Sequence, residues 1–320
     1  MKDKSSSVDI DIYEESRRKG IEAYNEQRYE YALKCFMSIE KVAPPKNDLK
    51  TWIQKCQQKI EPIDYVLVPG GHFSCKAHYY VNYKSFNVDV DSFYICKYEL
   101  TQGEYNRVTG NLKKENYCWL MEESWVISEG PRYIEVRGDS IPVRGTFQEF
   151  VEYCNARSKD EGYEGFYEIK GNSITVKHQG NGYRLATPYE WMFAAFGGNL
   201  NKKEKFLGGK TLSEVAWHLG NSNNKPHPVG LKKPNAIGLY DLQGNAPEIL
   251  QGDKNSKVFC SMCGGYNVSN WNYDQAYDPT YIWGTNNLKD ISTWTYGTRI
   301  VFIPKTFRNS NLDKIYKDPQ

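Results

Sequence analysis

The chain has 320 residues, of which 39% are hydrophobic and 25% charged, and its formal net charge is +2. This apolar share is enough for a packed core and excludes a chain that is disordered throughout. Charges of the two signs nearly balance and form no long run of one sign, which argues against a nucleic-acid-binding protein. No apolar stretch approaches the roughly 18 residues of a membrane span.

The start of the chain carries no apolar segment like that of a signal peptide. We therefore expect a cytoplasmic protein as the sequence is written, or an exported one if a leader has been removed. The eight cysteines are too few, for this length, to form a disulfide framework. Several of them fit apolar patterns and are expected to be buried thiols.

Residues 11–60 are predicted to form three helices. Gly20, Ala32, Phe36 and Pro44 follow one another at the spacings of a tetratricopeptide (TPR) repeat. Small residues let two antiparallel helices approach, Phe36 fills the space between them, and Pro44 ends the second helix. A single repeat lacks the neighbours that normally cover its faces. This TPR-like unit is therefore expected to bind a protein or to pack on the main domain.

The third of these helices is predicted to begin at Asn47 or Asp48, either of which is a good N-cap. Beyond it the composition changes to short apolar runs, turns and glycines. We therefore divide the chain into an all-α helical unit over 1–61, a main domain over 62–305 and a C-terminal tail over 306–320.

Two helices interrupt the strands and loops of the main domain. The first is predicted over 146–157, where apolar side chains recur on one face. The second is predicted over 188–196, because Thr187 with Glu190 three residues later forms a capping box. Scattered short strands around two helices are typical of a loop-rich α+β domain.

A series of short segments gives this domain a more specific character. They are residues 66–73, 93–101, 142–143, 183–191, 215–222, 227–230, 234–241, 244–248, 264–265 and 297–299. In residues and in order they resemble the formylglycine-generating enzyme family, also called the sulfatase-modifying factor family. The resemblance covers about residues 63–303 and implies a variant of the C-type-lectin-like fold.

The resemblance also implies a chemistry. The family's enzymes oxidise a substrate cysteine to formylglycine with oxygen, and they hold Cu(I) between two cysteines, five and ten residues after the first glycine of a Gly-Gly pair. Counted from Gly264, these two positions hold Ser269 and Asp274. Soft thiolates hold Cu(I), whereas a hydroxyl and a carboxylate are hard ligands. Bound copper is therefore not expected. Cys260 and Cys263 lie three apart in a predicted strand and point to opposite faces, so buried thiols are favoured over a shared site.

A second metal site of the family binds calcium through oxygen atoms. Gln243, Asn245, Ala246 and Glu248 match that run, and such ligands suit Ca²⁺. Pro247 stands where the family has a tryptophan. The alternative is a turn that Asn245 and Glu248 hold together without a metal.

The segment 265–294 is rich in aromatic and asparagine side chains, which are typical of adaptable recognition surfaces. Its candidate binding residues are Tyr266, Asn267, Asn270, Trp271, Tyr273, Tyr277 and Trp283. The alternative is irregular structure stabilised by large rings.

The sequence thus predicts a noncatalytic protein, a pseudoenzyme of this family, that binds a protein, glycan or peptide. Two alternatives stay open. One is an oxidoreductase of the family with an altered active site. The other is a ligand-display protein diversified by retroelements, which uses the same fold but usually ends near the position of Arg299.

Overall fold

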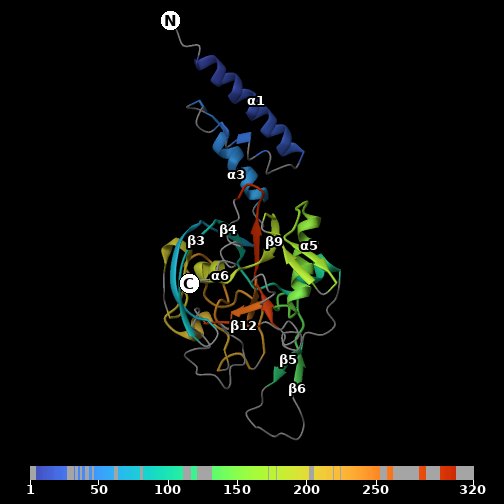
Figure 1. The fold of residues 1–320 in the computed structure, drawn as a ribbon. Helices are drawn as coiled ribbons and strands as arrows, with labels where there is room; N and C mark the ends of the chain where they lie inside the picture. The colour runs from blue at the N-terminus through green and yellow to red at the C-terminus, as the bar shows by residue number, and fades with distance from the viewer. Residues whose placement is uncertain are drawn as a thin grey trace. The chain divides into compact units, whose positions relative to one another are not determined.

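The computed structural model (Figure 1) describes most of the chain. The described residues are 5–26, 32, 35–36, 38–39, 43–44, 47–60, 64–79, 82–110, 117–120, 132–171, 173–177, 179–201, 205–218, 220–223, 225–252, 258–261, 281–285 and 296–307. Two compact units divide the chain, one of Met1–Tyr65 with Pro304–Phe307, the other of Val66–Ile303 with Arg308–Gln320. Within the described ranges, no helix has the length and apolar character to cross a membrane.

Two helices of the first unit are described, α1 (Ser5–Asn25) and α3 (Leu49–Ile60). A side-chain carbon on Gly20 would lie 2.7 Å from the ring of Phe36, so the close approach there requires glycine. The Phe36 ring in turn stacks on that of Trp52, with centroids 5.7 Å apart. Gly20 and Phe36 are thus in close contact, and the Phe36 ring also packs on Trp52 of α3.

The start of α3 is held by the two residues that the sequence singled out as caps. Asn47 Oδ1 accepts from the backbone N–H of Leu49 at 2.9 Å. Asp48 pairs with Arg17 of α1, whose Nε lies 2.9 Å from Asp48 Oδ1. The hydrogen bond from Arg17 lowers the pKa of Asp48. A cap and an ion pair thus fix the same helix end.

The second unit is built on two larger sheets. The four-stranded sheet has the order β1 (Tyr65–Val68), β4 (Phe93–Cys96), β14 (Ile300–Ile303) and β9 (Gly182–Leu185). The six-stranded sheet has the order β13 (Gly297–Thr298), β10 (Glu248–Leu250), β11 (Val258–Ser261), β12 (Tyr281–Thr285), β2 (Gly71–Tyr79) and β3 (Asn82–Val90). Two hairpins complete the described strands, β5 (Tyr117–Leu120) with β6 (Arg132–Glu135), and β7 (Tyr167–Lys170) with β8 (Ser173–Val176).

The described helices of this unit are α4 (Gln102–Thr109), α5 (Phe147–Asp160), α6 (Pro188–Ala195) and the short α7 (Leu212–Val215), with a 3₁₀ turn, η2 (Gly198–Leu200). Both predicted helices are confirmed as α5 and α6, each with a capping box. The helix α4 was not predicted, although Thr101 caps it by accepting from the N–H of Glu104. Helices and strands together make this unit a mixed α and β domain.

Aromatic rings fill much of the core around β14. The ring of Phe302 lies 4.8 Å from that of Tyr183 and 5.1 Å from that of Tyr163, centroid to centroid. Beside them, Arg184 of β9 and Glu190 of α6 form an ion pair of 2.6 Å in which neither side chain is exposed. Large rings thus stabilise the core of this loop-rich domain.

Candidate functional site

The residues at the family's two thiolate positions, Ser269 and Asp274, lie outside the described residues, as does Cys263. The same holds for most of the predicted recognition residues, namely Tyr266, Asn267, Asn270, Trp271, Tyr273 and Tyr277. Trp283 lies on β12, where its backbone pairs with that of Cys260 on β11.

The predicted oxygen ligands occupy one tight turn that leads into β10. Asp241 and Asn245 both adopt left-handed backbone conformations, with φ of 54° and 61°. Asparagine and aspartate tolerate this region better than other non-glycine residues. Gly244 lies so close to Trp217 that a side-chain carbon would approach its carbonyl oxygen to 2.3 Å. The local sequence therefore shapes the turn and presses it against the loop that contains Trp217.

Gln243 and Asn245 use their side chains to bind neighbouring backbone. Gln243 Oε1 accepts from the N–H of Leu207 at 2.8 Å. Asn245 Oδ1 accepts from the N–H of His227 at 2.9 Å, while its Nδ2 donates to Glu99 Oε2 at 2.6 Å. Both side chains thereby connect the turn to more distant segments.

Glu248 also receives hydrogen bonds from the protein itself. Its Oε2 accepts from Trp191 Nε1 at 2.7 Å, and its Oε1 accepts from Arg299 Nη2 at 3.0 Å. All the side-chain oxygens of the predicted calcium ligands thus have protein donors. Among the described residues, no group of three or more His, Cys, Asp or Glu is arranged to hold a metal.

Three buried carboxyl groups lie around the guanidinium of Arg299. Burial raises the pKa of Glu99 well above its ordinary value, and the charges of Asp241 and Glu248 raise it further. Burial likewise raises the pKa of Asp241 to about 6. Asp241 Oδ2 accepts from the N–H of Gly230 at 2.7 Å, but its buried Oδ1 has no hydrogen-bond partner in the described part of the chain. One arginine thus offsets only part of this acidic charge.

The loop beside the turn carries a stack of side chains. The Trp217 ring stacks on the ring of His227, with centroids 3.8 Å apart, and Lys232 Nζ lies 4.0 Å from the Trp217 centroid. His218 Nδ1 accepts from the N–H of Gly220, so its Nε2 carries the proton and donates to Ser213 Oγ at 2.8 Å. A serine that accepts from histidine is not activated for nucleophilic attack, so this pair does not form a catalytic dyad.

The sequence profile of the sulfatase-modifying factor enzyme 1-like domain matches residues 51–301. The chain belongs to this family. Chaperone protein LppX of Paenibacillus barcinonensis is 31% identical over 218 residues, which cover 58% of this chain and 70% of that protein.

Two solved structures share the fold of this sulfatase-modifying factor chain. The crystal structure of CarF has a TM-score of 0.54 at 22% identity, and covers 76% of this chain and 98% of its own. Treponema denticola variable protein 1 has a TM-score of 0.57 at 21% identity, and covers 75% of this chain and 95% of its own. At these identities the likeness shows the fold alone.

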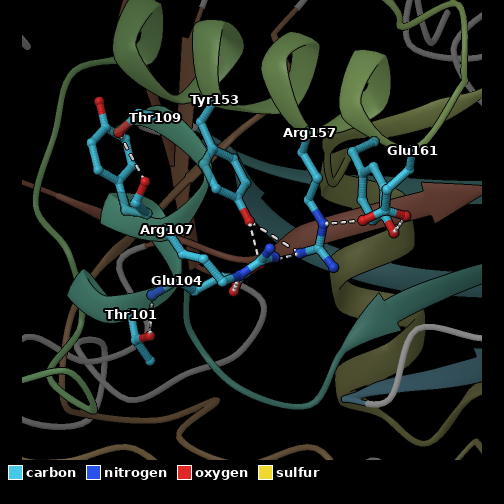
Figure 2. Close-up of polar contacts among 9 residues, drawn as sticks. Thr101, Glu104, Arg107, Thr109, Tyr153, Arg157 and Glu161 are labelled. Atoms are coloured by element: carbon cyan, nitrogen blue, oxygen red, sulfur yellow. Dashed lines mark hydrogen bonds and ion pairs between the residues drawn. The ribbon is translucent and has the colours of Figure 1, made fainter. Parts of the chain in front are cut away.

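A second polar network of the sulfatase-modifying factor domain lies between α4 and α5 (Figure 2). Arg157 Nη1 lies 2.9 Å from Glu104 Oε1, and Arg107 Nε donates to Glu104 Oε2 at 2.8 Å. Tyr153 and Glu161 complete it, since Tyr153 donates to Glu104 and Arg157 donates to Glu161. Although burial raises the pKa of Glu104, the bonds from Arg107 and the charge of Arg157 lower it overall. The network holds two helices together.

Three residues around the turn were not predicted as site residues: Glu99, Asp241 and Arg299. Each lies in a segment that resembles the family, so a signal was present, but it did not show that they meet. Glu99 and Asn245 are 146 positions apart in the chain, and Arg299 and Glu248 are 51 apart. Only the fold brings them together.

Proposed function

We propose that this chain is a noncatalytic, polypeptide-binding member of the sulfatase-modifying factor family. The observation that carries the proposal is the presence of Ser269 and Asp274 at the positions of the family's thiolates. Neither a hydroxyl nor a carboxylate selects Cu(I) as a thiolate does. The chain therefore lacks the ligands that would hold the copper for oxidation of a substrate cysteine.

Several features support a polypeptide as the ligand. The relative from Paenibacillus barcinonensis, at 31% identity, is named a chaperone protein. The aromatic segment 265–294 has the composition of a recognition surface, and a TPR-like repeat in the first unit would add a second one. The proposed lectin-like variant of the fold is also one that presents loops for binding. Glycans remain the alternative ligand.

The reaction of the family's enzymes provides the test that this chain is noncatalytic. The chain is incubated with copper, oxygen, a reductant and a peptide that carries a sulfatase motif, and aldehyde is sought by mass spectrometry. We expect no aldehyde from this chain and normal conversion by a catalytic family member in parallel. The variant Ser269→Cys/Asp274→Cys, measured for Cu(I) binding, is the matched control and should gain affinity for the metal. Turnover by the unaltered chain at the rate of the enzyme would disprove the proposal.

Polypeptide binding needs its own experiment. Chemically unfolded citrate synthase is diluted into buffer with this chain or with the same mass of serum albumin, and aggregation is followed by light scattering. We expect less scattering with this chain, because a bound unfolded segment is withheld from aggregation. Equal scattering in the two samples would remove the support for a polypeptide ligand.

Calcium binding by Gln243, Asn245, Ala246 and Glu248 stays a prediction. An ion that binds only the native state raises its melting temperature. If calcium binds there, excess calcium gives a higher melting temperature than EDTA, and Glu248→Gln abolishes the difference. Identical melting curves in calcium and in EDTA would show that no calcium binds there and that protein contacts alone hold the turn in place.

A further inference from the structure

Positive charge is concentrated in one loop region of the second unit. Residues 205–233 contain five lysines, one glutamate and neither arginine nor aspartate, whereas the whole chain has a net charge of only +2. We define the lysine surface by the residues that this region presents together: Lys210, His218, Lys225, Leu231, Lys232 and Lys233.

Hydrogen bonds and an ion pair bring these residues into one area around α7. Lys233 Nζ lies 2.9 Å from Glu214 Oε2, and the same carboxylate accepts from the backbone N–H of Lys210. Lys232 Nζ donates to the carbonyl oxygen of Ser213 at 2.8 Å. Residues at both ends of the region thus meet at a single short helix.

Lys225 and His218 join this area through the aromatic stack. The backbone N–H of Lys225 donates to the carbonyl of Ser222, which also accepts from the ring of His227. That ring stacks on Trp217, and Lys232 Nζ also lies over the Trp217 ring. Burial and the charge of Lys232 lower the pKa of His218.

Among the described residues, few acidic groups have contacts with these lysines. Glu214 is the one acid of the region, and Lys233 already pairs with it while keeping 62% of its own side chain exposed. Asp241 interacts electrostatically with Lys232 but is itself buried. Next to the lysines, Leu231 exposes 61% of its surface. The surface therefore offers several positive charges beside an exposed apolar side chain.

We propose that the lysine surface binds an acidic segment of a partner polypeptide, with carboxylates against the lysines and an apolar side chain against Leu231. This inference rests on the proposed polypeptide-binding function and names the chemistry of its partner. Single-stranded nucleic acid fits less well, because base stacking requires a free aromatic face. The Trp217 ring already stacks on His227 and has Lys232 Nζ at 4.0 Å from its centroid.

The probe is a fluorescently labelled peptide of repeating glutamate, leucine and glycine, compared by anisotropy with a peptide in which glutamine replaces every glutamate. The test variant is Lys210→Gln/Lys225→Gln/Lys233→Gln, all exposed positions. The control is Lys76→Gln/Lys159→Gln/Lys177→Gln, which removes the same charge from exposed positions elsewhere. Labelled oligothymidine and vesicles containing phosphatidylserine serve as competing polyanions.

We expect the acidic peptide to bind the unaltered chain at least about tenfold more tightly than the test variant, while the control variant changes little. Added salt should weaken the binding, since exposed charges are screened. Equal binding of the glutamine peptide, equal loss in the control variant, or no binding of the acidic peptide overturns the inference. So does tighter binding of oligothymidine or vesicles.

The citrate synthase experiment separates this inference from the function on which it rests. If the test variant loses the acidic peptide and suppresses aggregation less well, both stand. If the test variant suppresses aggregation to the same extent as the unaltered chain, the chain binds polypeptides, but not through the lysine surface. If the unaltered chain does not suppress aggregation at all, the proposed function fails first.

Discussion

At the scale of single residues, Asp241 is an acid whose ionisation is unfavourable in the folded protein. Its side chain is buried, its pKa is raised to about 6, and one oxygen has no hydrogen-bond partner within the described residues. A folded-state pKa above the unfolded value means that the native state binds the proton more tightly. This group therefore favours folding at acidic pH, and that contribution declines as the pH rises through about 6.

The variant Asp241→Asn keeps the size and the acceptor oxygen but cannot ionise. At each pH, the free energy of unfolding of the variant is compared with that of the unaltered chain. We expect this difference to shift in favour of the variant by up to roughly 3 kcal/mol from about pH 4 to pH 7.5, since a pKa unit corresponds to about 1.4 kcal/mol. Urea unfolding at the two pH values, in buffer with EDTA, measures the change. A difference that does not vary with pH would show that Asp241 ionises normally.

At the scale of secondary-structure elements, β9 is connected to α6 by the ion pair of Arg184 with Glu190. Neither side chain is exposed, and Glu190 also accepts from the N–H of Thr187 to complete the capping box. Removing one partner of such a pair leaves an uncompensated buried charge, which is far more costly than losing an exposed pair.

We therefore expect Arg184→Met to lower the free energy of unfolding by about 3–5 kcal/mol, measured by urea denaturation. The double variant Arg184→Met/Glu190→Gln should recover part of this loss, because glutamine is neutral and still fits the capping box. Lys170→Met, at an exposed pair with Glu168, is the control and should leave the transition unchanged. A small loss in Arg184→Met, or no recovery in the double variant, would argue against the uncompensated charge as the cause.

Local signals predicted the elements better than they predicted the site. The helix α6 could be recognised because Thr187 and Glu190 lie three residues apart, and the turn before β10 because its residues are contiguous. Strand pairing could not be derived in this way. The N–H of Leu100 donates to the carbonyl of Thr298, and no local pattern connects residues so far apart. The same is true of Glu99 and Asn245 at the candidate site.

At the scale of the whole molecule, β14 has a position that its place in the sequence does not suggest. It pairs antiparallel with β4 on one side and with β9 on the other. It is thus interior to the four-stranded sheet, and the backbone of each neighbouring strand depends on it for hydrogen bonds.

A chain that ends at Tyr296 lacks both β13 and β14. We expect it to show no cooperative thermal transition for the second unit by circular dichroism, because the sheet loses an interior strand together with the core ring of Phe302. A chain that ends at Phe307 keeps every described strand and should retain the transition. Cooperative melting of the shorter chain near the temperature of the full one would contradict this account.

The interior position of β14 also has a consequence for synthesis on the ribosome. Translation delivers β4 and β9 long before Ile300–Ile303, so their hydrogen-bonding edges stay without this strand until that segment has been made. Pairings between distant segments form slowly, and exposed strand edges favour aggregation in the meantime. The four-stranded sheet can therefore be completed only after Ile300–Ile303 has left the ribosome, and nascent chains of this protein should depend on cellular folding factors until then.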